Sequence, residues 1–342
     1  MKRILVCGPI FDTPSGPSGQ GGKLYTKLKA EGYTIYKRSK YRNKLLRVID
    51  TLFFVIFHAR KYDIILIQMF SNMAFIIDFL VINIAQLLNK KTIPIIRGGA
   101  FVEFYNRFPN WVGGVLKKSS LVSSPSLFIG EFLKTKNIAV LNIPNFIETH
   151  KFPYTWVPSD SPNLLWVRAF TDIYKPEFAI KTIQKLKTDF PNIKLTMVGP
   201  DMGKLAYCKE LINELGLNQS IHITGSISNN ELSKIYASHT IYINTTSYES
   251  FGVALIEAAC TGIPVVTTDV GEIPFMWQNG EDMLIVKDNN LDAFTNAIKL
   301  LLTDKNLQIK LSKNANTKAE KYGWDNVKPQ WDSLLTVKSL IK

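Results

Sequence analysis

The chain alternates between short, continuous apolar runs and longer segments in which apolar residues recur every three or four positions. Continuous apolar runs are typical of strands in a parallel sheet covered on both faces, and the longer period is typical of amphipathic helices. In the first half this pattern predicts strands at 3–9, 34–37, 63–69, 92–97, 121–124 and 140–143, and helices at 21–31, 43–60, 74–89 and 126–136.

The same alternation restarts after residue 162. It predicts strands at 163–168, 194–198, 221–224, 241–245, 264–268 and 283–286, and helices at 176–188, 204–215, 230–237, 252–260, 291–302, 312–321 and 324–342. Between the halves, residues 146–162 carry three prolines and no periodicity, which predicts a hinge. We therefore expect an α/β protein of two Rossmann-like domains, 1–150 and 151–342, facing each other across a cleft, with the last helix packing back on the first domain.

Composition narrows the class of protein. A chain of 342 residues with 46% hydrophobic content can bury two cores of ordinary size. Its three cysteines, Cys7, Cys208 and Cys260, follow no metal or redox spacing, and its four histidines show no ligand pairing. A reduced, cytoplasmic setting without a bound metal is the simplest expectation. The best candidate for a membrane span, 73–88, is shorter than the roughly 20 residues required, so we expect any membrane contact to be peripheral.

The excess positive charge lies entirely in the first half. Residues 1–150 hold 21 Lys and Arg against 8 Asp and Glu, whereas residues 151–342 hold 20 of each. The densest basic cluster comprises Lys37, Arg38, Lys40, Arg42, Lys44 and Arg47, and the apolar segment 45–57 overlaps its end. We interpret the cations as a docking site for an anionic membrane surface, and the apolar residues as a helix that covers the sheet. Nucleic acid is not an expected partner, because interleaved aromatic residues and a recognisable motif are both missing.

The segment 247–270, SYESFGVALIEAACTGIPVVTTDV, carries the most specific chemistry. Glu249 precedes a Ser250-Phe251-Gly252 turn that opens an apolar helix, and Glu257 follows about a turn and a half into that helix. The free amides and positive dipole end at Gly252 form a natural seat for a diphosphate. Taken singly, each glutamate is better explained as a solvated helix charge.

A second candidate is the glycine-rich segment 13–22, TPSGPSGQGG, between the first predicted strand and helix. The amides of Gly19, Gly21 and Gly22 could reach a phosphate or a sugar, and the alternative is a mobile linker loop. The spacing does not match the dinucleotide fingerprint.

Taken together, the motifs resemble the donor site of the family 4 retaining glycosyltransferases. The shared positions after the fourth strand of the second half are Glu249, Phe251, Gly252, Glu257, Gly262, Pro264, Val265, Val266, Gly271, Ile273 and Pro274. The segment 166–186 resembles the part of that family that supplies an Arg and a Lys to the donor phosphates, here Arg168 and Lys175. Weaker matches place Gly199, Gly225 and Ile227 near the nucleotide, and the glycine segment over the diphosphate.

The resemblance implies a GT-B fold and transfer of a hexose-type sugar from a UDP- or GDP-linked donor, with retention, without a metal and without a further cofactor. Arg168 and Lys175 would stabilise the departing diphosphate. Glu249 would contact the sugar and Glu257 the ribose, with Ser250 and Val253 beside the donor. The implied acceptor is lipid-linked or a polysaccharide, as in the synthesis of bacterial capsule or lipopolysaccharide on the inner face of the cell membrane.

One position departs from the family pattern. Many members carry a His after the fourth strand of the first domain, where this chain has Arg97-Gly98-Gly99. We expect Arg97 to bind an acceptor phosphate or a donor carboxylate. Two rival functions remain open at this stage, a nucleotide-sugar epimerase of the same fold and a non-catalytic partner subunit. A glycosidase is disfavoured because it needs two carboxylates across one bond and no diphosphate site.

Overall fold

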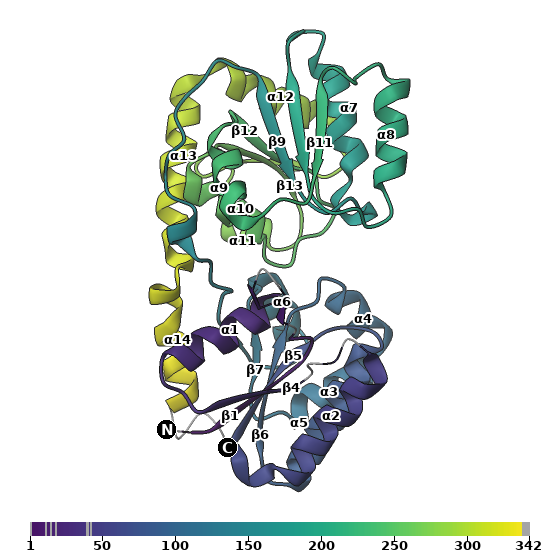
Figure 1. Cartoon of the computed structure of the whole chain (residues 1–342), viewed down its shortest axis with the longest axis vertical. Coiled ribbons are helices and arrows are strands. Elements are labelled where there is room, and N and C mark those ends of the chain that lie inside the picture. Colours follow the sequence, from purple (N-terminus) through teal and green to yellow (C-terminus); the bar gives the residue numbers. More distant parts are fainter. Residues whose placement is uncertain are drawn as a thin grey trace. The chain divides into compact units, whose positions relative to one another are not determined.

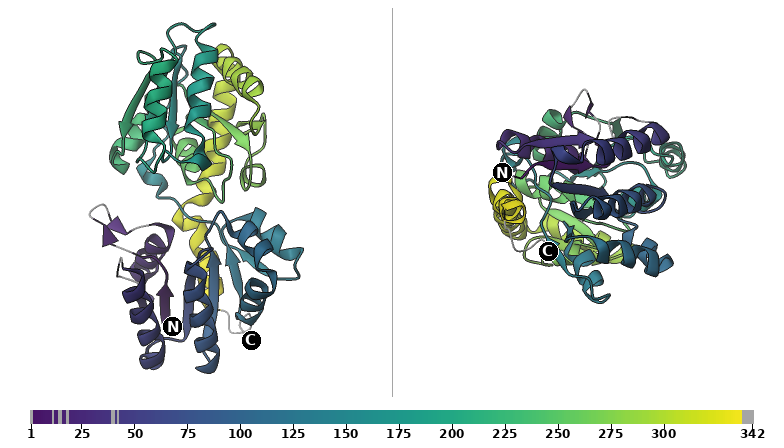
Figure 2. Two further views of the ribbon diagram at one scale, coloured as in Figure 1. Left: turned by 90° about the vertical axis from the view of Figure 1, so that its right-hand side faces the viewer. Right: turned by 90° about the horizontal axis from the view of Figure 1, so that it is seen from below.

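A computed structural model of the chain describes residues 2–10, 12–13, 16–17, 19–38, 41 and 43–336. These residues form two compact units. The first extends to Phe146 and includes the described residues from Val327 onward, and the second comprises Ile147–Asn326. The predicted boundary at residue 150 lies four residues inside the second unit. Each unit is a sheet with helices on both faces (Figure 1 and Figure 2).

The first unit contains a six-stranded parallel sheet in the order β4-β1-β5-β6-β7-β8. Its strands are β1 (Ile4–Cys7), β4 (Ile35–Arg38), β5 (Ile64–Met69), β6 (Lys91–Ile96), β7 (Val122–Ser124) and β8 (Val140–Asn142), and β2 (Asp12–Thr13) pairs separately with β3 (Gly16–Pro17). Its helices are α1 (Gly19–Ala30), α2 (Lys44–Phe57), α3 (Ala74–Leu87), α4 (Phe101–Arg107), α5 (Pro109–Lys118) and α6 (Leu127–Lys134).

The second unit contains another six-stranded parallel sheet, in the order β11-β10-β9-β12-β13-β14. Its strands are β9 (Asn163–Val167), β10 (Lys194–Val198), β11 (Ile221–Gly225), β12 (Ile241–Asn244), β13 (Val265–Asp269) and β14 (Leu284–Lys287). Its helices are α7 (Pro176–Leu186), α8 (Leu205–Glu214), α9 (Asn229–Ala237), α10 (Val253–Thr261), α11 (Ile273–Met276), α12 (Leu291–Thr303) and α13 (Lys305–Ala319), and α14 (Trp324–Thr336) returns the chain to the first unit.

Each sheet has a point at which the strand order reverses direction. In the first unit this point lies between β1 and β5, and in the second it lies between β9 and β12. Both pairs of strands are almost entirely buried apolar sequence, so they occupy the centre of their sheets. Ligands of open parallel sheets bind outside the carboxyl ends of the strands at such a reversal point. The two points are therefore the places at which functional side chains are expected.

Three helices were not predicted from the sequence, α4, α5 and α11. Helix α4 is rich in aromatic residues, which have modest helix propensity, and Pro109 begins α5 directly after it. Tertiary packing stabilises both helices, because the Trp111 ring contacts Phe75 with ring centroids 4.8 Å apart and Phe104 at 6.2 Å. Helix α13 also begins earlier than predicted, where Asp304 caps the amide of Leu307 at 2.9 Å.

The predicted hinge at 146–162 is wrong for most of its length, because this segment packs on the second unit. Phe152 and Trp156 are buried in a cluster with Tyr236. The indole nitrogen of Trp156 donates to the carbonyl of His239 at 3.1 Å, and its amide donates to the carbonyl of Thr261 at 3.1 Å. The prolines interrupt regular structure here without freeing the chain.

The interpretation of 13–22 as a glycine-rich loop also needs correction. Gly19, Gly21 and Gly22 form the first turn of α1, and Pro14, Ser15 and Ser18 lie outside the described residues. A Cβ atom at Gly21 would lie 2.8 Å from the side chain of Gln68, so this glycine permits close packing of α1 on β5.

Helix α2 departs from its expected role as a simple cover for the sheet. Its inner face, with Phe54 and Val55, is buried in the core of the first unit. Its outer face leaves six large apolar side chains between 43% and 69% exposed, those of Leu45, Leu46, Ile49, Phe53, Ile56 and Phe57. Of the basic cluster, Lys40 and Arg42 lie outside the described residues. Across the part of the chain that the structure describes, no helix is both long and apolar enough to span a bilayer.

Candidate functional site

The reversal point of the second sheet brings together three polar residues from separate segments. Arg168 follows the end of β9, Asn244 ends β12, and Glu249 lies in the loop between β12 and α10. The Arg168 Nε atom donates to Asn244 Oδ1 at 3.0 Å, and its Nη2 atom donates to Glu249 Oε2 at 2.6 Å. The sequence predicted Arg168 and Glu249 as separate ligands of the donor, and the structure joins them in one ion pair.

This ion pair is shielded from water. The side chains of Arg168 and Glu249 are only 9% and 10% exposed. Burial acts to lower the pKa of Arg168, but the charge of Glu249 and the neighbouring tyrosines outweigh burial and raise it above its ordinary value. The guanidinium also lies 5.0 Å from the centre of the Tyr174 ring. Arg168 is therefore a permanent cation held in one orientation.

The loop that carries Glu249 is fixed by its own backbone. The second carboxylate oxygen, Oε1, accepts hydrogen bonds from the amides of Ser250 at 3.1 Å and Phe251 at 3.3 Å. The Glu249 carbonyl accepts from the amide of Glu272 at 2.9 Å. A Cβ atom at Gly271, whose φ is +55°, would lie 2.1 Å from that carbonyl oxygen. Gly271 is thus needed for α11 to approach the Glu249 loop.

Lys175 lies immediately before α7 in the left-handed backbone region, with φ 45° and ψ 58°. This conformation is costly for a residue with a side chain, and such strain is concentrated at functional sites. Its Nζ atom contacts Asp288 Oδ2 at 2.8 Å and Asn289 Oδ1 at 2.6 Å, both just after β14. Asp288 and Asn289 were not predicted as site residues, although they open the run Asp-Asn-Asn after the last strand of the sheet.

Helix α10 begins as predicted at the glycine that follows Phe251. Gly252 is its N-cap, with φ +82°, and the cap has no side chain that could satisfy the first amides. Phe251 was predicted as a donor ligand, but its side chain is buried and packs edge-on against Tyr322, with ring centroids 5.7 Å apart. Only the backbone of Phe251 remains a candidate. Ser250 and Val253 are partly buried beside it.

Glu257 lies on α10 and is also partly buried. Burial, with a further contribution from the Glu257 charge, raises the pKa of the Cys260 thiol to about 12. Two predicted glycines have clear backbone roles. A Cβ atom at Gly199 would lie 1.8 Å from the carbonyl oxygen of Arg168, whereas Gly225 has φ +73° and open space around it. Ile227, two residues beyond Gly225, is partly buried.

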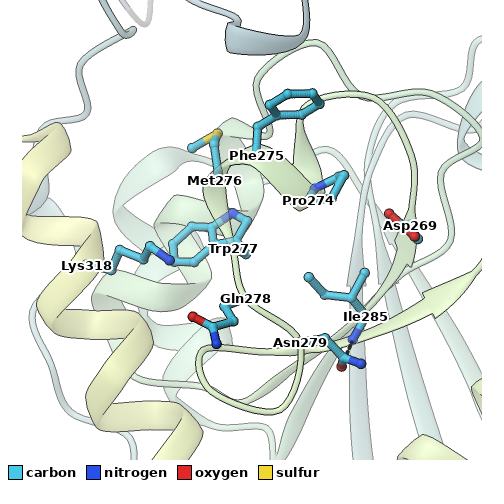
Figure 3. A pocket seen from close by; sticks show the side chains of 9 residues that line it. All are labelled: Asp269, Pro274, Phe275, Met276, Trp277, Gln278, Asn279, Ile285 and Lys318. Carbon is cyan, nitrogen blue, oxygen red and sulfur yellow. Dashed lines mark hydrogen bonds between the residues drawn. The ribbon is translucent and has the colours of Figure 1, made fainter.

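A cavity of about 500 Å³ lies between α11, β13 and β14 (Figure 3). Its lining includes Asp269, Phe275, Trp277 and Lys318, but none of the predicted cations or glutamates. The indole nitrogen of Trp277 is buried and has no hydrogen-bond partner within the described ranges. Of its lining residues, only Pro274 is a position of the sequence motif, so the pattern along the chain did not indicate a cavity here.

The predicted acceptor residue, Arg97, belongs to the first unit and follows β6. Its Nε atom donates to Gln68 Oε1 at 2.8 Å, and its Nη1 atom donates to Asn145 Oδ1. Both acceptors are neutral, and burial lowers the pKa of Arg97 to about 9, so it stays a cation at neutral pH. Of the two glycines that follow, Gly98 lies against Ser71, where a Cβ atom would be 3.1 Å from the hydroxyl, and Gly99 is partly exposed.

The residues that the structure describes contain no candidate metal site. They contain no group of three or more His, Cys, Asp or Glu side chains placed to hold an ion. All three cysteines are free and buried.

Comparison with known proteins places this site in a family. Residues 150–318 match the family model of the glycosyl transferases group 1. A D-inositol 3-phosphate glycosyltransferase of Corynebacterium urealyticum is 30% identical over 155 residues, which cover 44% of this chain and 37% of the relative. The chain therefore spans less than half the length of that relative.

Two solved structures share the fold over nearly the whole chain. Sucrose-phosphate synthase of Thermosynechococcus elongatus has a TM-score of 0.79 at 18% identity, covering 98% of both chains. HepE of Anabaena, in complex with UDP, has a TM-score of 0.78 at 14% identity, covering 98% of this chain and 99% of HepE. The predicted fold class, α/β of the GT-B type, is confirmed. The Arg168–Glu249 site lies within residues 150–318, the region that matches the glycosyl transferases group 1 family.

Proposed function

We propose that the chain transfers a hexose-type sugar from a nucleotide diphosphate sugar to an acceptor hydroxyl, with retention of configuration and without a metal ion. The observation that carries the proposal is the convergence of Arg168, Asn244 and Glu249 at the reversal point of the second sheet. A buried, oriented guanidinium at this place suits the pyrophosphate of a sugar donor. A nucleotide-sugar epimerase would need the same donor site, and product analysis separates the two.

In the proposed reaction, the bond between the sugar C1 and the donor phosphate oxygen breaks while a bond forms between C1 and the acceptor oxygen. The acceptor proton passes to the departing phosphate oxygen. Negative charge develops on the diphosphate, and fixed cations stabilise it most where water is excluded. Arg168 uses two of its nitrogen atoms for Asn244 and Glu249, and a guanidinium has five N–H donors, so it can bind phosphate without losing these contacts.

Lys175 would supply the second cation, released from or shared with Asp288 when the donor binds. Glu249 would accept a hydrogen bond from a sugar hydroxyl, and Glu257 would bind the ribose hydroxyls. The backbone at Gly225 and Ile227 would lie against the base. HepE is described in complex with UDP-glucose, which supports a UDP-linked donor as the first candidate.

The first test is a titration of UDP- and GDP-linked sugars followed by analysis of hydrolysis and epimer products without an acceptor. We expect one donor to be hydrolysed slowly to sugar and nucleoside diphosphate. Arg168→Ala and Lys175→Ala should lower turnover by two or more orders of magnitude, and Glu257→Ala should weaken nucleotide binding in calorimetry. Epimerised donor, or near-wild-type turnover in both cation variants, would contradict the proposal.

We further propose that the outer face of α2 docks the enzyme on an anionic membrane, where the acceptor is a lipid-linked or polysaccharide glycan. The exposed apolar face and the excess positive charge of residues 1–150 support this. Sedimentation with vesicles should require anionic lipid and should fade as salt is added. Phe53→Ser and Phe57→Ser should weaken it, and indifference to lipid charge and to both variants would reject the docking site.

A further inference from the structure

The first sheet has its own reversal point, and two adjoining cavities lie there. The inner cavity, of about 90 Å³, is lined by Cys7, Gly8 and Pro9 after β1 and by Gln68 and Phe70 at the end of β5. The outer groove, of about 600 Å³, lies between α2 and α3. The two share Arg47, Ala74 and Ile77 as lining residues, so they adjoin at these residues.

The inner cavity contains buried polar atoms that no described residue satisfies. Gln68 is 3% exposed, and its Nε2 atom has no acceptor, because the Oε1 atom alone is engaged, by Arg97. Asp78 is also buried, and its Oδ2 atom has no partner in the described structure. Buried polar atoms without partners are rare in native proteins, and each requires an explanation. Both side chains belong to the lining of the inner cavity, which favours a polar ligand group there.

The chemistry of the inner cavity favours an oxygen-rich, anionic group. Burial raises the pKa of Asp78 well above its ordinary value, which favours the protonated carboxyl group over a carboxylate that would repel an anion. Gln68 Nε2, the Asp78 hydroxyl and the Arg47 guanidinium are then all hydrogen-bond donors. A volume of about 90 Å³ corresponds to about three waters, which is the scale of one phosphate group.

The outer groove has the opposite character. Leu45 and Val48 of α2 face Met73, Ile76 and Ile77 at the start of α3 across it. Met73 and Ile76 are exposed, although both are apolar. An apolar groove that adjoins a small pocket of donors matches a molecule with a hydrocarbon chain and a phosphate head.

We infer that the groove between α2 and α3, together with the pocket of Arg47, Gln68 and Asp78, binds the lipid phosphate of a lipid-linked glycosyl acceptor, whose reacting hydroxyl lies beyond the phosphate. The hydrocarbon chain occupies the groove, and the phosphate lies at Arg47 in the reversal point of the first sheet. This inference rests on the proposed function, because the ligand is an acceptor only if the chain transfers a sugar. It adds the chemical class of the acceptor and the site that binds it. Arg97 donates to Gln68 Oε1, so a second cation contacts a residue that lines the pocket.

The experiment is calorimetric titration of the full chain with alkyl phosphates below their micellar concentrations. From hexyl to decyl phosphate, affinity should rise about fourfold for each added CH₂ that becomes buried. Inorganic phosphate should bind far more weakly, and decyl maltoside more weakly than decyl phosphate. No gain in affinity with chain length would overturn the assignment.

Matched variants locate the bound chain and head. Ile76→Trp should fill the groove and weaken decyl phosphate binding about tenfold or more, whereas Ile49→Trp, on the outer face of α2 and outside both cavities, should leave it within twofold. Arg47→Gln should weaken decyl phosphate about tenfold without affecting decyl maltoside, and Arg60→Gln, which removes the same charge elsewhere, should change neither. Circular dichroism checks that each variant is folded.

Two further measurements distinguish binding in the groove from membrane docking by α2 and from hydrolysis at the donor site. Phe53→Ser should weaken vesicle sedimentation but not decyl phosphate binding; the reverse dependence would place the chain on the outer face of α2 and overturn the groove. Hydrolysis of nucleotide sugar without an acceptor should survive Ile76→Trp. A wild-type chain that hydrolyses no nucleotide sugar contradicts the proposed function, while unchanged decyl phosphate affinity in Ile76→Trp contradicts only the acceptor site.

Discussion

The two reversal points place arginine in opposite electrostatic settings. In the second unit, Arg168 forms a shielded ion pair with Glu249, and its pKa is raised. In the first unit, Arg97 is held by neutral Gln68 and Asn145, and its pKa is lowered. A cation with a carboxylate partner is oriented before the ligand arrives. A cation with only neutral partners keeps its attraction for an anion. The same fold thus places an arginine oriented by a carboxylate in the second unit and an arginine held by neutral groups in the first.

The largest expected effect comes from removing each arginine in turn. Arg168→Met leaves the Glu249 carboxylate buried without its partner and should cost about 3–5 kcal/mol of unfolding free energy. Arg97→Met leaves only neutral acceptors unsatisfied and should cost about 1–3 kcal/mol. Urea unfolding of both variants measures this difference. A larger loss in Arg97→Met would reverse the comparison.

The strained backbone at Lys175 sharpens the contrast within the second unit. Lys175→Ala keeps an unfavourable left-handed residue, whereas Lys175→Gly relieves it, so the glycine variant should be more stable by about 1 kcal/mol. Both variants lose the ammonium group and should lose about 10²–10³-fold in turnover. Asp288→Asn keeps the lysine and should retain more turnover than either. Equal turnover in Lys175→Gly and the wild type would show that only the backbone matters there.

Lowering the pH should stabilise the first unit through Asp78 and destabilise the second unit through His239. Its pKa is raised by burial in the folded first unit, so the folded state binds a proton that the unfolded state releases above about pH 4. The stabilisation from this group is therefore complete below about pH 4 and decreases as the pH rises toward the pKa of the folded state. Asp78→Asn should unfold at higher urea than the wild type at pH 7 and at the same urea below pH 4. A variant less stable at pH 7 would contradict the protonated assignment.

The smallest effect is expected at His239 in the second unit. Burial lowers its pKa, partly offset by a bond to the Ile235 carbonyl at 2.7 Å, so the folded state keeps it neutral. Its stabilising contribution is present above about pH 6.5 and is lost as pH falls through the lowered value. His239→Gln should remove this part of the acid sensitivity, measured as unfolding midpoints between pH 5 and 7.5. An unchanged pH dependence would mean that His239 is not the group responsible.

Periodicity predicted both central strands correctly at each reversal point, because a buried parallel strand needs an unbroken apolar run. It predicted α10 to within one residue, since Gly252 and Gly262 mark its ends. It failed at α4 and α5, where Trp111 stabilises aromatic helices of modest propensity. It also failed at the outer face of α2, because amphipathicity predicts a helix but does not determine whether anything covers its second apolar face.

The sequence alone determined the two sheets, the residues Arg168, Lys175, Glu249 and Arg97, and the family that their motifs resemble. Only the tertiary structure decided that Arg168 pairs with Glu249, that Asp288 holds Lys175, and that Phe251 is a core residue. The physical reason is that ion pairs and burial depend on which strand ends lie side by side. Strand order is set by the packing of segments that are distant in sequence, so the local sequence pattern does not indicate it.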